Sequence, residues 1–225
     1  QIAAGEVIQR PSSAVKELLE NAIDANSTKI QLIVKDAGST LIQVIDDGTG
    51  MSKEDAEMCF KKHATSKIKN SDDLYAITSK GFRGEALSSI ASVAQIELKT
   101  KMEHTDIGHT VHIEASKITK SEPCAYNNGT SISMKNLFFN VPARRNFLKS
   151  KGVETKHIID EFQRIALTHP EVHFTMHHNE SLIFDLPITK RRQRIVAIFG
   201  KKYNERLVPV DEKTTITNIS GFVLK

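Results

Sequence analysis

Three polar side chains recur at helical spacing near the start of the chain: Glu17, Asn21 and Asp24. At about 100° per residue they share one face of a helix predicted over residues 13–26. The opposite face is apolar and contains Val15, Leu18, Leu19, Ala22 and Ile23. A carboxylate, an amide oxygen and a second carboxylate side by side could activate a water molecule and hold a hard cation such as Mg²⁺. The alternative is an ordinary solvated face, but Asn is a poor helix former, which favours a functional set.

A second candidate group follows a strand predicted over residues 40–45. There the sequence reads Asp46-Asp47-Gly48-Thr49-Gly50. Taken alone this is a turn, because glycine readily adopts positive φ. It could also provide an acceptor carboxylate at the end of the strand, followed by two glycines that allow a ligand to lie against the backbone.

The third candidate group adjoins a long polar segment, residues 63–84. Such a segment inside a compact domain is often a lid over a site. It ends in the sequence G-F-R-G-E-A-L at residues 81–87, which opens a helix predicted over residues 85–93. Glycines directly before a helix expose its first amides at the positive end of the helix dipole, where a phosphate can bind. A cap loop without a ligand is the equal alternative.

The elements that must position these groups alternate between strands and helices. Strands are predicted at residues 30–35, 40–45, 95–99, 110–114, 130–135, 172–177 and 181–186. Helices are predicted at residues 13–26, directly after a Ser52 cap, at 85–93 and at 153–168. Pro187 and the basic run that starts at Lys190 mark a change in composition. We place there the boundary between a domain of residues 1–189 and the beginning of a second domain, residues 190–225.

The composition is that of an ordinary globular protein: 39% of the 225 residues are hydrophobic and 26% charged, enough for one sizeable domain or two smaller ones. Cys59 and Cys124 have no nearby partner, so neither a disulfide framework nor a structural zinc site is expected. His173, His177 and His178 lack matching carboxylates or cysteines, so we do not interpret them as a metal site. No apolar run approaches the roughly 20 residues of a membrane span. We therefore expect a soluble, intracellular protein.

The net charge of +4 is unevenly distributed. Residues 1–189 carry a net charge of −2, whereas residues 190–225 carry one of +6. A further basic cluster contains Lys135, Arg144, Arg145, Lys149, Lys151 and Lys156. Such clusters are commonly solvated surface, but they also suit a polyanion such as DNA. Any DNA binding should be independent of sequence, because this cluster and the run at residues 190–194 would meet phosphates.

Two common nucleotide-binding motifs are missing from the sequence: the G-x-x-x-x-G-K-[ST] loop and the G-x-G-x-x-G turn of a βαβ unit. Four short motifs occur instead, in this order: E-x-x-x-N-x-x-D-A from Glu17, D-x-G-x-G from Asp46, G-F-R-G-E-A-L from Gly81, and G-T at Gly129. This set resembles the ATPase family shared by gyrase B, the heat-shock chaperone and histidine kinases. The stretches Q-I-A-A-G-E-V-I, H-A-T-S-K-I and N-V-P-A-R-R-N-F-L narrow the resemblance to the MutL family of DNA mismatch-repair ATPases.

The resemblance implies that Glu17 is the general base for the water that attacks the γ-phosphate of ATP, and that Asn21 holds the Mg²⁺ ion. Asp46 would accept a hydrogen bond from the adenine amino group. Gly50 would let the base approach, and Thr130 would support Asp46 through a water molecule. The remaining residues implied in nucleotide binding are Asp24, Ala25, Thr65, Ser66, Lys67, Gly81, Phe82, Arg83, Gly84, Glu85, Ala86 and Leu87.

By the same resemblance the fold is an α/β (α+β) two-layer sandwich. Helices would cover one face of a mostly antiparallel mixed sheet, and the start of a smaller α/β domain would follow. Residues 63–84 would form the lid, Ala25 would line the wall near the adenine, and the amides of residues 84–87 would meet the phosphates. The implied partners are DNA, mismatch-repair proteins and, in the full-length ATP-bound protein, a second copy of the chain. The implied compartment is the cytoplasm, or the nucleus in a eukaryote.

Two features depart from the family pattern. No N-terminal arm that could wrap onto a partner subunit precedes Gln1, and the second-domain lysine that reaches the γ-phosphate would lie beyond Lys225. We therefore expect a monomeric fragment that binds nucleotide with weak or no turnover. The alternatives are a nucleotide-binding scaffold without useful turnover and a type II topoisomerase-like ATPase domain. A histidine kinase is disfavoured, because none of the nine histidines lies in an evident phospho-acceptor helix.

Overall fold

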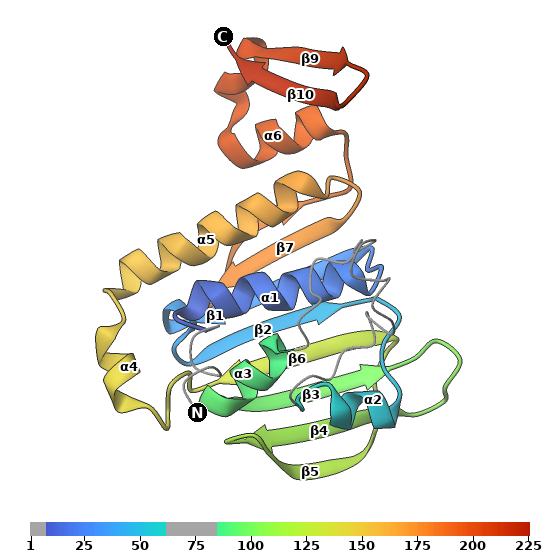
Figure 1. Ribbon diagram of the computed structural model, residues 1–225, viewed down its shortest axis with the longest axis vertical. Helices are drawn as coiled ribbons and strands as arrows, with labels where there is room; N and C mark the ends of the chain where they lie inside the picture. The colour runs from blue at the N-terminus through green and yellow to red at the C-terminus, as the bar shows by residue number, and fades with distance from the viewer. Residues whose placement is uncertain (1–7, 62–84) are drawn as a thin grey trace.

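An eight-stranded sheet forms the centre of the molecule (Figure 1). The structure is a computed structural model that describes residues 8–61 and 85–225. The strands follow the order β5-β4-β3-β6-β2-β1-β7-β8; β1 and β7 pair in parallel, and the other neighbours are antiparallel. Their bounds are β1 (Lys29–Lys35), β2 (Leu41–Asp46), β3 (Gln95–Lys101), β4 (Gly108–Glu114), β5 (Lys117–Cys124), β6 (Gly129–Lys135), β7 (His173–His178) and β8 (Ser181–Leu186).

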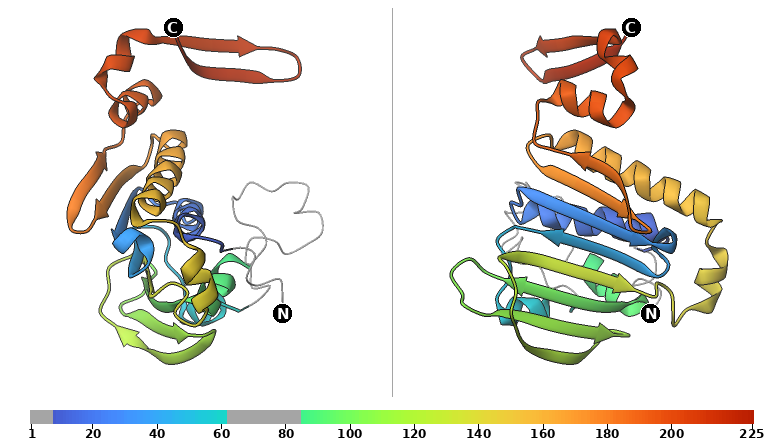
Figure 2. Two further views of the ribbon diagram at one scale, coloured as in Figure 1. Left: turned by 90° about the vertical axis from the view of Figure 1, so that its left-hand side faces the viewer. Right: turned by 180° about the vertical axis from the view of Figure 1, so that it is seen from behind.

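Helices cover one face of this sheet, as the edge-on view in Figure 2 shows. The long helices α1 (Pro11–Asp24) and α5 (Lys151–Thr168) pack against each other, and α3 (Ala86–Val93) packs against α1. The shorter helices are α2 (Lys53–Met58) and α4 (Pro142–Phe147). The predicted two-layer fold, with helices on one face of a mostly antiparallel sheet, is therefore confirmed. Within residues 8–61 and 85–225, no helix has the length and apolarity needed to span a bilayer.

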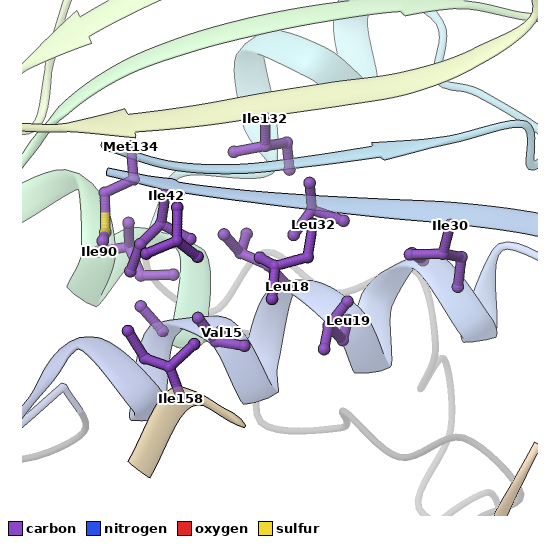
Figure 3. Close-up of a cluster of buried hydrophobic side chains, with 14 of the residues drawn as sticks. Val15, Leu18, Leu19, Ile30, Leu32, Ile42, Ile90, Ile132, Met134 and Ile158 are labelled. Atoms are coloured by element: carbon purple, nitrogen blue, oxygen red, sulfur yellow. The ribbon is translucent and has the colours of Figure 1, made fainter. Parts of the chain in front are cut away.

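The apolar stripe of α1 packs on the inner face of the sheet. Pro11 takes the first helical position, where its missing N–H is not needed, so the helix begins two residues before the predicted start. Asn26, at φ 59°, follows the last turn and ends the helix. Between these ends Val15, Leu18 and Leu19 are buried. Figure 3 shows them among buried side chains of the sheet, α3 and α5: Ile30, Leu32, Ile42, Ile132, Met134, Ile90 and Ile158.

Within the eight-stranded sheet, the sequence prediction misses one strand, β5, at the edge. Most residues of β5 are exposed, so neither face needs apolar side chains. Its sequence K-I-T-K-S-E-P-C therefore shows no alternation of apolar and polar residues. Pro123 fits there because an edge strand leaves one row of N–H positions unpaired. β5 therefore carries no periodic signal that would distinguish it from a loop.

The chain after the large sheet forms α6 (Arg191–Phe199), the 3₁₀ segment η4 (Lys201–Arg206) and the strands β9 (Leu207–Lys213) and β10 (Asn218–Leu224). The two strands pair only with each other, as a separate two-stranded sheet. In Figure 1 these elements lie beyond α5 and β7, away from the large sheet. The boundary at residue 190 stays a prediction.

One buried arginine, Arg194, fastens α6 to the chain that precedes it, between residues 166 and 187. Its side chain is fully buried, at 0% exposure. The guanidinium lies within hydrogen-bonding distance of five backbone carbonyl oxygens, those of Ala166 (2.9 Å), Pro170 (3.3 Å), Val172 (2.8 Å), Leu186 (3.2 Å) and Pro187 (3.0 Å). The expectation that the whole run 190–194 meets DNA phosphates is therefore wrong for Arg194, because its side chain is buried and both terminal nitrogens donate to backbone carbonyls inside the protein.

We expect Arg194→Met to lower the free energy of unfolding by about 3 kcal/mol or more, because several buried carbonyls would lose their donor at roughly 1–3 kcal/mol each. Urea unfolding monitored by circular dichroism measures this change. Arg191→Met, at an exposed position of the same helix, is the control and should stay within about 0.5 kcal/mol. A loss below about 1 kcal/mol for Arg194→Met would show that the carbonyls find other partners.

Candidate functional site

The row of polar residues predicted at the start of the chain lies on α1. Glu17, Asn21 and Asp24 are all half-buried, whereas Leu18 and Leu19 on the other side of the helix are buried. The backbone carbonyl of Asn21 accepts from the amide N–H of the residue after the helix at 3.0 Å, so the last turn is regular up to its end. The helix thus holds two carboxylates and an amide at successive turns of one face.

Asp46 closes β2 and faces the same layer as α1, because it continues the inward-facing row of Ile42 and Val44. Its Oδ1 accepts from the Gly48 N–H at 2.9 Å and from the Ser27 hydroxyl at 3.2 Å. Burial raises the pKa of Asp46 to about 6, although the hydrogen bonds from Gly48 and Ser27 act in the opposite direction. This carboxyl group therefore changes charge close to neutral pH.

The neighbouring carboxylate, Asp47, has a structural task instead. It accepts from the Thr28 N–H at 2.8 Å, the Thr28 hydroxyl at 2.6 Å and the Lys29 N–H at 2.8 Å. Although its burial acts to raise the pKa of Asp47, these hydrogen bonds lower it below the ordinary value. Asp47 thus fixes the loop after β2 to the start of β1, and with it the position of Asp46.

The two glycines of this loop are required by close backbone contacts. A Cβ on Gly48 would lie 2.7 Å from the Ala25 carbonyl oxygen and 2.7 Å from Ser27 Oγ. Gly50 has φ +67°, and a Cβ there would lie 2.1 Å from the Lys101 carbonyl oxygen. The protein itself therefore occupies these spaces, so the fold needs both glycines. The predicted approach of a ligand to Gly50 stays a prediction.

Thr130 lies beside Asp46, since the two residues are partners across β6 and β2. Its hydroxyl contacts the Thr100 hydroxyl at 3.1 Å, and Thr100 Oγ1 accepts from the Met51 N–H at 2.9 Å. Both threonines are buried. Thr100 was not predicted, because a threonine inside a strand such as β3 has no distinctive sequence signal.

The start of α3 supplies the remaining described candidates. Glu85 is the N-cap of this helix, and Ala86 and Leu87 form its first turn, all three half-buried. The Glu85 carbonyl accepts from the Ser89 N–H at 2.9 Å and the Ser88 hydroxyl at 2.9 Å. The other predicted residues, Thr65, Ser66, Lys67, Gly81, Phe82, Arg83 and Gly84, lie outside the described residues.

The described candidates therefore come together on the helix-covered side of the sheet. Asp46 and Thr130 project from neighbouring strands toward that layer, and α1 and α3 pack against each other within it. Ala25 links the groups, because its carbonyl accepts from the Thr49 N–H at 3.0 Å. The site offers carboxylate and amide oxygens from α1, one carboxyl of raised pKa, and a helix N-terminus.

Comparison with known proteins identifies the same group of ATPases. The model of the family described as "Histidine kinase-, DNA gyrase B-, and HSP90-like ATPase" matches residues 9–140. The chain is 60% identical to the DNA mismatch repair protein MutL of Christiangramia forsetii and 58% identical to that of Flavobacterium johnsoniae, over 100% of this chain in each case. It covers 36% and 35% of those proteins, so the chain spans about a third of the length of these curated relatives.

Solved structures agree with this result. The Aquifex aeolicus MutL ATPase domain complexed with ADP aligns with a TM-score of 0.72 at 28% identity, covering 92% of this chain and 73% of that one. The N-terminal domain of a DNA repair protein aligns with a TM-score of 0.80 at 27% identity, covering 98% and 69%. The predicted resemblance to MutL is confirmed over the whole chain. The chain belongs to the histidine kinase-, DNA gyrase B- and HSP90-like ATPase family.

Proposed function

We propose that this chain is the ATP-binding and ATP-hydrolysing domain of a DNA mismatch-repair protein. The observation that carries the proposal is Asp46, a half-buried carboxyl group on the inner side of the sheet whose Oδ1 is fixed beside α1 by two hydrogen bonds. Such a group suits a ligand that brings its own hydrogen-bond donor. The adenine amino group is such a donor, and a solved relative is an ADP complex.

The residues of α1 would perform the chemistry. Glu17 would be the general base that takes a proton from the attacking water. Asn21 would provide an oxygen ligand for Mg²⁺. This ion prefers oxygen ligands and commonly binds one or two from the protein, while phosphates and water molecules fill its other coordination positions. The donor set fits this mode, because the half-buried Asn21 amide lies on α1 between the carboxylates of Glu17 and Asp24. Mg²⁺ would neutralise charge on the phosphates.

The phosphates would lie at the start of α3, near Glu85, Ala86 and Leu87, where amides and the positive end of the dipole favour anions. Gly50 and Thr130 would border the base, and Ala25 would form part of the wall near it.

We propose further that ATP closes a lid formed by residues 63–84 and promotes dimerisation of the full-length protein around DNA. This would take place in the cytoplasm or, in a eukaryote, in the nucleus. A scaffold that binds without turnover is the alternative that kinetics would separate.

A basic surface on α4 and α5 supports the DNA part of the proposal. Arg145, Lys149, Lys151 and Lys156 are exposed there, and the exposed aromatic ring of Phe147 lies between them in the sequence. Lys151 also pairs with Asp36 at 2.7 Å, so part of its charge is neutralised. Flexible cations of this kind meet phosphates rather than base edges, so they provide affinity without sequence preference.

Asp46→Asn should have opposite effects on binding and on stability. ATP affinity should fall by about 10- to 100-fold, because one hydrogen bond to a charged group disappears. The folded-state pKa of about 6 lies above the ordinary value of 3.8. The protonated Asp46 carboxyl therefore stabilises the folded wild type below pH 3.8, and this contribution to stability is lost as the pH rises through 6. The free energy of unfolding of the variant should therefore exceed that of the wild type by about 1–3 kcal/mol at a pH of about 7.5. This difference should disappear near a pH of about 4.

Calorimetric titration with ATP and GTP, together with urea unfolding at both pH values, tests this prediction. Asp106→Asn, at an exposed loop position, is the control and should change neither quantity. Equal affinity of the wild type for ATP and GTP would exclude recognition of the adenine amino group by Asp46.

Glu17→Ala should retain ATP binding and lose hydrolysis by about 10²- to 10⁴-fold, the usual contribution of a positioned base. Single-turnover phosphate release in the full-length protein measures the loss, with saturating ATP and Mg²⁺. If ATP binding disappeared with turnover, Glu17 would be a structural or ligand-holding residue. If turnover were unchanged, the assignment of Glu17 as base would fail, whereas a wild type without turnover would favour the scaffold alternative.

Arg145→Glu combined with Lys149→Glu should lower DNA affinity evenly across unrelated duplexes. The dependence of affinity on salt should also become weaker, by a slope of about 0.9 for each phosphate that the protein no longer neutralises. Fluorescence anisotropy at several salt concentrations measures both. Lys117→Glu with Lys120→Glu on the exposed strand β5 makes the same change in net charge and is the matched control. An equal decrease of DNA affinity in the control would mean that the net charge of the protein, rather than this surface, determines the affinity.

A further inference from the structure

Ser27 lies in the short connection between α1 and β1 and is buried, with 5% of its surface exposed. Its Oγ lies 2.6 Å from the Ala22 carbonyl oxygen and 3.2 Å from Asp46 Oδ1. Asn26, in the left-handed conformation, turns the chain so that Ser27 returns beneath the last turn of the helix. One hydroxyl group therefore touches both the helix that carries Glu17 and the carboxyl group at the end of β2.

The hydroxyl of Ser27 has one proton and faces two acceptors. The Ala22 carbonyl also accepts from the Ser27 N–H at 3.4 Å, so it keeps a partner when the hydroxyl turns away from it. Hydrogen bonds to an ionised acceptor are about twice as strong as those between neutral groups. The proton should therefore turn to Asp46 when that carboxyl is ionised, and to Ala22 when it is neutral.

Hydrogen-bond donors stabilise the ionised form of Asp46. Two described titratable groups that interact with it are the Asp47 carboxylate beside it and the Tyr126 phenol. Asp47 opposes ionisation by its own negative charge. The support comes from neutral donors, which are the amides of Gly48 and Thr130 and the Ser27 hydroxyl. Of these described donors, the Ser27 hydroxyl alone belongs to a side chain, so a substitution can remove it without changing the backbone.

We propose that Ser27 is a positioning residue for base recognition, whose hydroxyl holds Asp46 ionised and oriented to accept from a 6-aminopurine and couples it to the C-terminal turn of α1. The inference rests on the proposed role of Asp46 in binding adenine. It adds a specific residue outside the E-x-x-x-N-x-x-D-A and D-x-G-x-G motifs. It also predicts that base recognition depends on pH through a contact with the catalytic helix.

The test compares Ser27→Ala with the wild type in the full chain between a pH of about 5.5 and one of about 8.5, a range that brackets the titration of Asp46. The ¹³C shift of the Asp46 carboxyl group, followed by NMR without nucleotide, should titrate at higher pH in the variant by about 0.5 to 1 unit. The pH at which ATP affinity is half lost should rise by the same amount. ATP binding should then be about 3- to 8-fold weaker near a pH of about 5.5 and close to that of the wild type at the alkaline end of the range.

Ser12→Ala is the matched control, because Ser12 is equally buried, at 5% exposure, at the other end of the same helix. It should leave both titrations unchanged. An unshifted carboxyl titration in Ser27→Ala, or a uniform decrease of ATP affinity at every pH, would reduce Ser27 to a packing residue and overturn the inference while Asp46 keeps its role. If Asp46→Asn leaves ATP affinity unchanged, the proposed function of Asp46 fails and the inference fails with it.

Discussion

The junction between the end of α1 and the loop after β2 is the constraint on which the candidate site depends. Three separate contacts hold it: the Thr49 amide on the Ala25 carbonyl, the Asp47 carboxylate on the start of β1, and the Ser27 hydroxyl. Gly48 makes the approach possible because any side chain there would meet Ala25. Without this junction, the carboxyl at the end of β2 and the polar row of α1 would not be fixed relative to each other.

The carboxyl group at this junction lowers the stability of the fold, and the apolar core compensates for that loss. Burial of a carboxyl group disfavours its charged form, and Asp46 is such a group. The continuous apolar core between α1, α3, α5 and the sheet compensates for that cost. The Gly48 amide and the Ser27 hydroxyl both donate to Asp46, so an apolar residue at this position would leave these two donors without their acceptor.

The sequence was sufficient for the elements with clear periodicity. The strand at residues 181–186 has the predicted bounds, the Ser52 hydroxyl accepts from the Asp55 amide as a cap should, and α1 differs from its prediction by two residues at each end. Edge strand β5 could not be predicted because exposure on both sides removes alternation. Arg194 was wrongly interpreted as surface charge, since a single letter in a basic run gives no sign that five carbonyls surround it.

The candidate site was predictable only where a motif carries it. Glu17, Asn21 and Asp46 could be found because helical spacing and a strand end indicate them, and family resemblance gave them roles. Ser27, Thr100 and Asp47 act through contacts between segments 18 to 49 residues apart in sequence, such as Lys29 with Asp47 or Met51 with Thr100. Small polar residues of this kind are common in any chain, so only the folded arrangement distinguishes them.

The parallel pairing of β1 with β7 has a consequence for synthesis of the protein. β1 lies inside the sheet, yet one of its two neighbours is a segment that begins at His173, far later in the chain. Until the ribosome has released that segment, β1 presents an unpaired edge. The nascent chain must therefore pass through a state that is open to association with other strands. Completion of the large sheet waits for its last two strands, although the candidate catalytic residues emerge well before them.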